Sequence, residues 1–223
     1  MRKRVIDFCW LCIGVTLISF GIALMNKSGL GQTAYSGLAN VVGQIFTIKN
    51  GTVLIYFNIA FVCGQIILLR KGFKALQLLQ VVVSYLSGIL VNFFIYDFAL
   101  TSGLIPANYA MQWFFSILGN LFISFGIAIV MVTALIKMPV EAFVQVLSDM
   151  IKQPFSRLRT LVDVLCIAVG ISLIVLYRLS FSSLREGTWV SMVLLGSSMG
   201  LTFPLAKKMI QRFNSVLLKK EQV

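Results

Sequence analysis

The chain has 223 residues, of which 59% are hydrophobic and only 12% are charged. This composition excludes an ordinary soluble domain and is typical of a protein that exposes apolar helices to lipid. The formal net charge of +12 does not indicate nucleic-acid binding, because the basic residues cluster at the ends of apolar runs. The chain lacks histidine and the common catalytic motifs, so we expect no enzyme, no cofactor and no metal site.

Six apolar stretches are long enough to cross a hydrocarbon core about 30 Å thick. They lie at residues 6–25, 52–70, 76–97, 110–135, 158–178 and 188–206. The first follows three basic residues, as in a signal peptide, but its apolar run is as long as a membrane span. We therefore interpret it as a retained transmembrane helix. Pro204 and the Lys207–Lys208 pair are expected to end the last span.

Two shorter segments, 33–47 and 139–151, separate the first and second spans of each half of the chain. Each places apolar residues on one face at helical spacing, with Thr33 as a candidate N-cap and Pro139 in a first turn. Their polar faces carry Ser36, Asn40, Gln44 and Thr47 in the first segment, and Glu141, Gln145, Ser148, Asp149 and Lys152 in the second. Both are too short and too polar to span, so we expect them to lie at the interface or to dip into the protein.

The distribution of lysine and arginine tests the number of spans. With six spans and both termini in the cytoplasm, 15 basic residues lie on the cytoplasmic side and 4 outside. If the two short segments also crossed, the same count would give 12 inside and 7 outside. The positive-inside rule favours six spans. We expect a multi-pass protein of the bacterial inner (cell) membrane with both termini cytoplasmic.

The hexapeptide Ile-Ser-Phe-Gly-Ile-Ala occurs at residues 18–23 and again at 123–128. The same offset of 105 residues aligns further polar positions, namely Ser36 with Glu141, Asn40 with Gln145, Gln44 with Asp149 and Asn58 with Asp163. The sequence therefore predicts an internal duplication. We place the first repeat at 1–98, an outer linker at 99–109 and the second repeat at 110–223.

Three spans per repeat is an odd number, so the second repeat must enter the membrane in the opposite orientation. The expected fold is all-α, with six transmembrane helices arranged as two inverted three-helix repeats. In each repeat a short amphipathic helix lies between the first and second spans. Inverted repeats are a common ground plan of secondary transporters, whose binding sites lie near the bilayer midplane.

Asp163 is the main candidate for a functional residue, because it lies about six residues into the fifth span, roughly 9 Å deep. A carboxylate at such depth is costly and usually faces a cavity, so it could bind a proton, a cation or a substrate amine. Asn58 would be its neutral counterpart in the first repeat. The alternative is that Arg159, one helical turn earlier, neutralises Asp163. Further candidates for substrate or ion binding are Asn40, Gln44, Gln145, Asp149 and Asn92.

Short motifs in both halves carry a family resemblance. The segment 21–43 reads Gly-Ile-Ala-Leu, followed by Gly-Leu-Gly-Gln-Thr-Ala-Tyr-Ser-Gly-Leu-Ala-Asn-Val-Val-Gly, and Thr160-Leu161-Val162-Asp163 opens a span of the second half. These motifs resemble the YczE/YyaS/YitT-like integral membrane proteins. The resemblance implies a multi-spanning bacterial membrane protein with a transport role and names no substrate. Where that family commonly has Pro-Trp-Asp, this chain has Ala34-Tyr35-Ser36, so an acidic role there is not carried over.

We therefore expect a small-molecule transporter that binds its substrate between the two repeats. The alternatives are a substrate-binding subunit of a larger importer and an accessory or regulatory subunit of a membrane complex. The expected partners are the lipid bilayer, an unknown small molecule, and either a membrane protein partner or a second copy of the chain. A stoichiometric protein partner would favour either subunit interpretation.

Overall fold

The computed structural model describes residues 2–133 and 135–219, and within them it contains helices and loops but no strand. The helices are α1 (Arg2–Ser28), α2 (Ala34–Phe46), α3 (Asn50–Leu69), η1 (Arg70–Gly72), η2 (Ala75–Leu78), α4 (Leu79–Asn92), η3 (Phe93–Asp97), α5 (Ala99–Ser102), α6 (Tyr109–Thr133), α7 (Pro139–Ile151), α8 (Phe155–Tyr177), η4 (Phe181–Ser183) and α9 (Glu186–Lys219). Six helical segments of the described chain are long and apolar enough to cross a membrane. The expected all-α class with six spans is confirmed.

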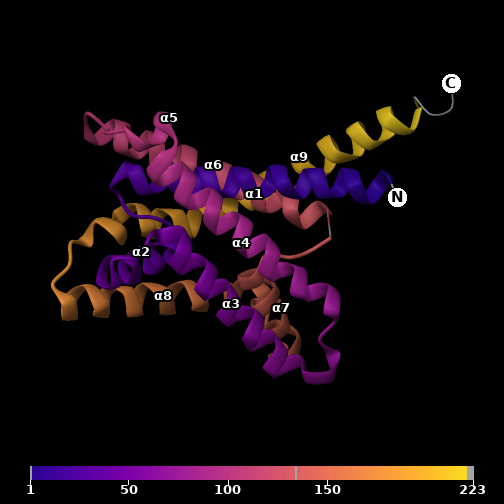
Figure 1. Ribbon diagram of the computed structural model, residues 1–223, viewed down its shortest axis with the longest axis horizontal. Coiled ribbons are helices and arrows are strands. Elements are labelled where there is room, and N and C mark those ends of the chain that lie inside the picture. Colours follow the sequence, from indigo (N-terminus) through magenta and orange to yellow (C-terminus); the bar gives the residue numbers. More distant parts are fainter. Residues whose placement is uncertain (1, 134, 220–223) are drawn as a thin grey trace.

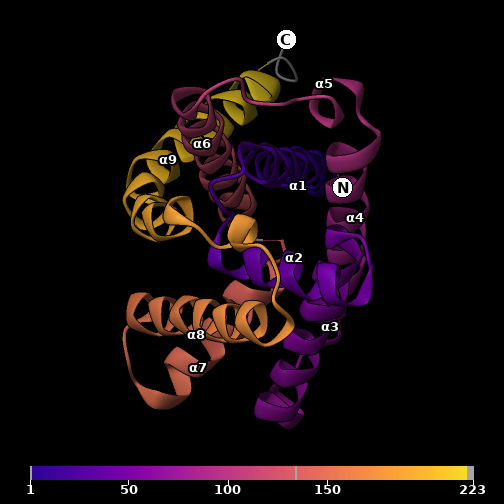
Figure 2. The same ribbon diagram turned by 90° about the vertical axis from the view of Figure 1, so that its left-hand side faces the viewer.

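The helices form two groups. In the first, α4, α1, α6 and α9 pack side by side in that order, and the second consists of α3, α2, α7 and α8 (Figure 2). Contacts between α3 and α4 join the groups. The start of α1 and the end of α9 lie at one end of the molecule, and the turn between α8 and α9 lies at the other (Figure 1). We call these ends the termini side and the opposite side.

Glycines bring α1 and α6 into close contact at the centre of the first group. A Cβ added to Gly14 would lie 2.9 Å from the carbonyl oxygen of Gly126, and one added to Gly21 would lie 2.5 Å from that of Gly119. Only residues without a side chain permit this approach of two helix backbones. Because Gly14 faces Gly126 while Gly21 faces Gly119, the two helices run antiparallel.

The serines of the two hexapeptide copies make equivalent contacts. Ser19 Oγ of α1 donates a hydrogen bond to the carbonyl of Ser87 in α4, at 3.3 Å. Ser124 Oγ of α6 lies 3.0 Å from Thr202 Oγ1 of α9. In each half, the repeated serine thus connects the first span to the third span of the same half.

The short helices form as predicted, and each packs against the other half of the chain. Thr33 accepts a hydrogen bond from the backbone N–H of Ser36 at the start of α2, and Pro139 occupies the first turn of α7. α2 contacts α8, while α7 contacts α3. In the second group, the short helix of each half therefore packs on the second span of the other half.

Two features of the spans differ from expectation. The prediction that Pro204 ends the last helix is wrong, because α9 continues through Pro204 to Lys219. A proline removes one backbone donor, and membrane helices tolerate it where neighbouring groups satisfy the carbonyl that it leaves. The third span ends in five residues of π-helix, Phe93–Asp97, which the hydrophobic pattern did not indicate.

Candidate functional site

A cavity of about 60 Å³ lies where the two groups of helices meet. Eight helices, α1 to α4 and α6 to α9, each contribute at least one lining residue. The polar lining residues are Thr33, Tyr35, Ser36, Asn58, Ser87, Glu141 and Arg159, and the remaining wall is apolar. Because Ser36 and Glu141 belong to the first turns of α2 and α7 and are both buried, these helices begin inside the protein. Of the two placements expected for the short segments, the structure has the one that dips into the protein.

Glu141 is the carboxylate that faces this cavity. Its side chain is only 9% exposed, and its Oε2 atom has no hydrogen-bond partner among the described residues. A second cavity of about 60 Å³ shares Glu141, Ile127 and Met138 with the first and includes Lys137 at the termini side. Burial raises the pKa of Glu141, although the Arg159 guanidinium acts in the opposite direction.

A buried amide pair positions the start of α7. Gln65 of α3 and Gln80 of α4 exchange hydrogen bonds of 3.1 and 3.3 Å. Gln65 Nε2 also donates to the carbonyl of Pro139, at 3.1 Å. Since Glu141 lies two residues beyond Pro139, these contacts fix the backbone that carries the carboxylate.

Glu141 was not among the candidate residues selected from the sequence, which placed it only on the polar face of the short helix. The offset of 105 residues could have found it. It aligns Pro139-Val140-Glu141 with Ala34-Tyr35-Ser36, so the buried Glu141 corresponds to the buried Ser36 of the first half.

Asp163 forms an ion pair instead of lining the cavity. Its Oδ1 atom lies 3.0 Å from Nη1 of Arg159, one turn earlier on α8, and both side chains are largely buried. This is the pairing that the alternative interpretation of Asp163 predicts. Arg159 itself contributes to the cavity wall, so the pair adds little net charge there.

Asn58 lines the cavity together with an aromatic ring. Tyr35 Oη donates a hydrogen bond of 2.9 Å to Asn58 Oδ1. The Tyr35 ring stands 6.0 Å from that of Phe57 and 5.9 Å from that of Phe61. The site thus combines a carboxylate, an amide and the edge of an aromatic cluster.

Asn40 and Gln44 connect the two halves on the opposite side. Both donate hydrogen bonds of 2.9 Å to Ser183 Oγ, in the turn between α8 and α9. The backbone N–H of Gln32 donates to the carbonyl of the same serine, at 3.2 Å. We call these four residues the Ser183 latch. It lies outside both cavities.

The three other candidates from the sequence have structural partners. Gln145 lines the second cavity and donates to Asp149 Oδ1 at 2.8 Å, whereas Asp149 is exposed. Asn92 of α4 accepts from the N–H of Gly51 at 2.8 Å and donates to Thr52 Oγ1 at 3.0 Å. Asn92 therefore connects α4 to α3 and does not face a cavity described here.

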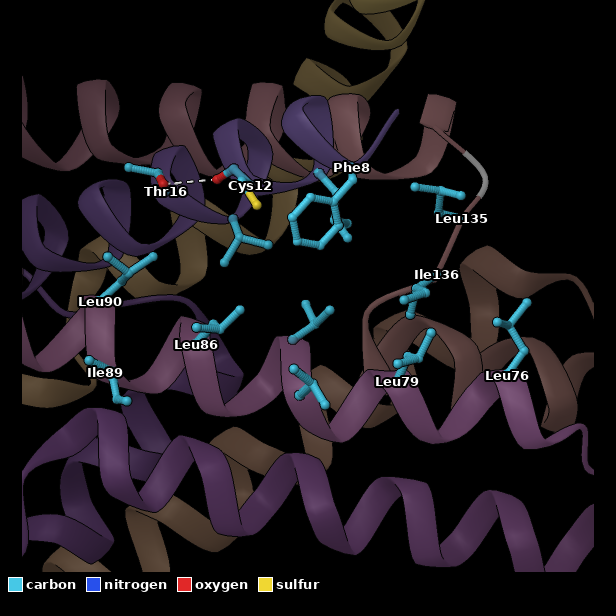
Figure 3. Close-up of a pocket in the computed structure, with 14 residues that line it drawn as sticks. Phe8, Cys12, Thr16, Leu76, Leu79, Leu86, Ile89, Leu90, Leu135 and Ile136 are labelled. Atoms are coloured by element: carbon cyan, nitrogen blue, oxygen red, sulfur yellow. Dashed lines mark hydrogen bonds between the residues drawn. The ribbon is translucent and has the colours of Figure 1, made fainter. Parts of the chain in front are cut away.

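A larger crevice of about 430 Å³ between α1 and α4 has a different character. Its wall is formed by aliphatic and aromatic side chains such as Phe8, Leu79 and Leu86 (Figure 3). The Thr16 hydroxyl donates to the Cys12 carbonyl in its own helix, at 2.8 Å. Such a surface offers a polar solute almost no hydrogen bonds, and in a bilayer acyl chains fill it.

Comparison with known proteins assigns the chain to a family. Residues 5–204 match a family described as a family of unknown function, DUF6198. The chain belongs to this family. No curated protein and no solved structure matches it. With six apolar helices long enough to span, this DUF6198 member is a multi-pass integral membrane protein.

Proposed function

We propose that this DUF6198 protein carries a small solute across the membrane and binds it in the central cavity. One observation carries the proposal: eight helices surround a cavity lined by Glu141, and one oxygen of this carboxylate, Oε2, is buried without a hydrogen-bond partner among the described residues. Burying such an oxygen is costly unless a ligand or a proton satisfies it. A ligand bound in the cavity, between the two halves of the chain, would supply a partner for the carboxylate.

The arrangement of the halves supports a carrier built from inverted repeats. α1 and α6 contain the same hexapeptide and run antiparallel, as the glycine contacts require. α2 of the first half packs on α8 of the second, and α7 of the second packs on α3 of the first. In carriers of this kind, one half moves against the other and exposes the site to each side in turn.

Differences between the halves suggest which side is closed. On the opposite side, Asn40 and Gln44 hold the Ser183 latch. Their repeat partners on the termini side, Gln145 and Asp149, bond to each other and not to the first half. This asymmetry supports a state in which the cavity is sealed on the opposite side and less restrained on the termini side.

The third spans of the two halves also differ in how closely they pack. A Cβ on Gly88 of α4 would meet the backbone of Gly51 in α3 at 2.5 Å, so these helices cross closely. A Cβ on Gly196 of α9, which aligns with Gly88 when the repeat offset is lengthened by three residues, would lie in open space among the described residues. If the two halves exchanged these arrangements, α9 would approach α8 and α4 would move away from α3. We propose this exchange as the transport step.

The rival interpretations make the protein a subunit of a larger complex. We would purify the full chain in a mild detergent and measure the stoichiometry of every co-purifying protein. A monomer or homodimer that, after reconstitution alone into liposomes, gives saturable uptake of at least one solute is the expected result. A reproducible one-to-one partner that uptake requires would contradict the proposal and favour a subunit.

A further inference from the structure

The ionised groups around the central cavity do not balance. Arg159 and Asp163 pair at 3.0 Å and cancel each other. Glu141 remains, with Oε2 buried and without a hydrogen-bond partner among the described residues. Lys137 lines only the second cavity and is exposed to solvent, where water screens its charge. The interior therefore has one negative charge in excess whenever Glu141 is ionised.

We propose that the central cavity binds a small monovalent organic cation of the alkylammonium class, with its charge on the Glu141 carboxylate, and that a proton replaces it when the site is empty. This inference rests on the proposed function, because it names the solute of the same cavity. The ammonium group donates hydrogen bonds to the carboxylate. Neither step makes or breaks a covalent bond apart from the O–H bond of Glu141.

The remaining wall suits a cation that carries an apolar body. The Tyr35 ring lines the cavity, and the face of an aromatic ring attracts ammonium ions. Asn58 Oδ1 is an additional acceptor close to the Tyr35 hydroxyl, at 2.9 Å. Ile22, Ile123 and Leu195 cover the alkyl part.

The size of the cavity limits the ligand. A buried water occupies about 10–15 Å³ of a cavity volume measured in this way. The central cavity of about 60 Å³ therefore holds about four waters or an ion of similar size. Ethylammonium falls within this limit. A bulky cation such as tetrabutylammonium does not fit without movement of the walls.

Competition between the cation and a proton makes binding pH-dependent. The charged and titratable groups that face Glu141 are Arg159 and Asp163 of α8, Tyr35 of α2 and Lys137 before α7. The residues that line the cavity from α1, α3, α4, α6 and α9 are not titratable. Burial raises the pKa of Glu141, so a larger share of the carboxyl is protonated near neutral pH than in an exposed glutamate. Lower pH removes the partner of the cation.

The test is isothermal titration calorimetry of the full chain in lipid nanodiscs with ethylammonium chloride as the ligand. We expect saturable binding at pH 8 that weakens as the pH falls, by up to tenfold per unit below the pKa of Glu141. Glu141→Gln should weaken binding at least tenfold, since the amide keeps the shape and removes the charge. Asp149→Asn, on the exposed face of the same helix, should leave the affinity unchanged. Ethanol, which is of similar size and lacks the positive charge, should not bind.

Several results would overturn the inference. They are the absence of ethylammonium binding to the wild type, equal affinity in Glu141→Gln, or an affinity that does not change between pH 5 and 8. A size-exclusion profile and melting temperature of Glu141→Gln equal to those of the wild type show that the variant is folded. Binding without movement of the ion across the membrane would leave the ligand class standing and contradict the carrier. Saturable uptake of a neutral or anionic solute, with no ethylammonium binding, would contradict the ligand class and support the carrier.

Discussion

Two buried acidic side chains in this protein are held in different ways. Asp163 has a guanidinium 3.0 Å away on its own helix, whereas Glu141 lines a cavity and its Oε2 atom is buried without a hydrogen-bond partner among the described residues. A buried ion pair that is broken on one side leaves an uncompensated charge, which is strongly destabilising. The first residue is therefore expected to act mainly on stability and the second mainly on ligand binding.

We predict that Asp163→Asn destabilises the protein by about 3 kcal/mol, because Arg159 then remains charged and buried without its partner. The double variant Asp163→Asn with Arg159→Met should recover most of this loss. Thermal unfolding in detergent measures both changes. An unchanged melting temperature of Asp163→Asn, combined with loss of ligand binding, would instead make Asp163 part of the binding site.

At the scale of whole helices, glycine residues determine where two helix backbones approach closely. The α1–α6 crossing depends on Gly21, whose added Cβ would lie 2.5 Å from the Gly119 carbonyl oxygen. The space beside Gly196 of α9, by contrast, is open among the described residues. A methyl group thus has opposite consequences at the two glycines.

Gly21→Ala should lower the stability by about 1–3 kcal/mol, because the new methyl group forces two helix backbones apart. Gly196→Ala should be neutral or raise the stability slightly, since alanine favours a helix over glycine. The melting temperatures of the two variants in the same detergent provide the comparison. Equal shifts of the two melting temperatures would mean that α1 and α6 do not cross closely at Gly21.

The elements of this fold were largely predictable from the sequence. Runs of about 20 apolar residues require helices in lipid, and Thr33 and Pro139 mark the start of α2 and α7 through local capping chemistry. The continuation of α9 past Pro204 was not predictable, because it depends on whether neighbouring groups compensate for the missing N–H. Local pattern cannot show this.

The site was less predictable than the fold. Periodicity placed Glu141 on the polar face of a short helix, and it could not show that this face turns inward. That orientation is set by contacts distant in sequence, such as Gln65 with the carbonyl of Pro139. Asp163 is buried, as expected of a carboxylate inside a span, but its pairing with Arg159 was only one of two alternatives.

At the scale of the whole molecule, the two halves of the chain are held differently on the two sides. The Ser183 latch joins them on the opposite side, and no glycine described in α8 or α9 makes a close backbone contact between these two helices like that between Gly51 and Gly88. If the halves can exchange these arrangements, a residue in the central cavity will be reachable from either side of the membrane. A binding subunit without transport needs access from one side only.

The most direct measurement is therefore the two-sided accessibility of one cavity residue. Ser87→Cys places a thiol in the lining of the cavity, in a background where the native cysteines Cys9, Cys12, Cys63 and Cys166 are serines. Single cysteines at the exposed positions Thr47 and Gln153 serve as controls, one for each side of the membrane. A membrane-impermeant maleimide is applied to vesicles of either orientation.

The carrier account predicts that Ser87→Cys reacts from both sides, while each control reacts from one side only. Ethylammonium at saturating concentration should slow the labelling from both sides. Reaction of Ser87→Cys from a single side, with both controls behaving as expected, would contradict alternating access and leave a binding subunit as the better account.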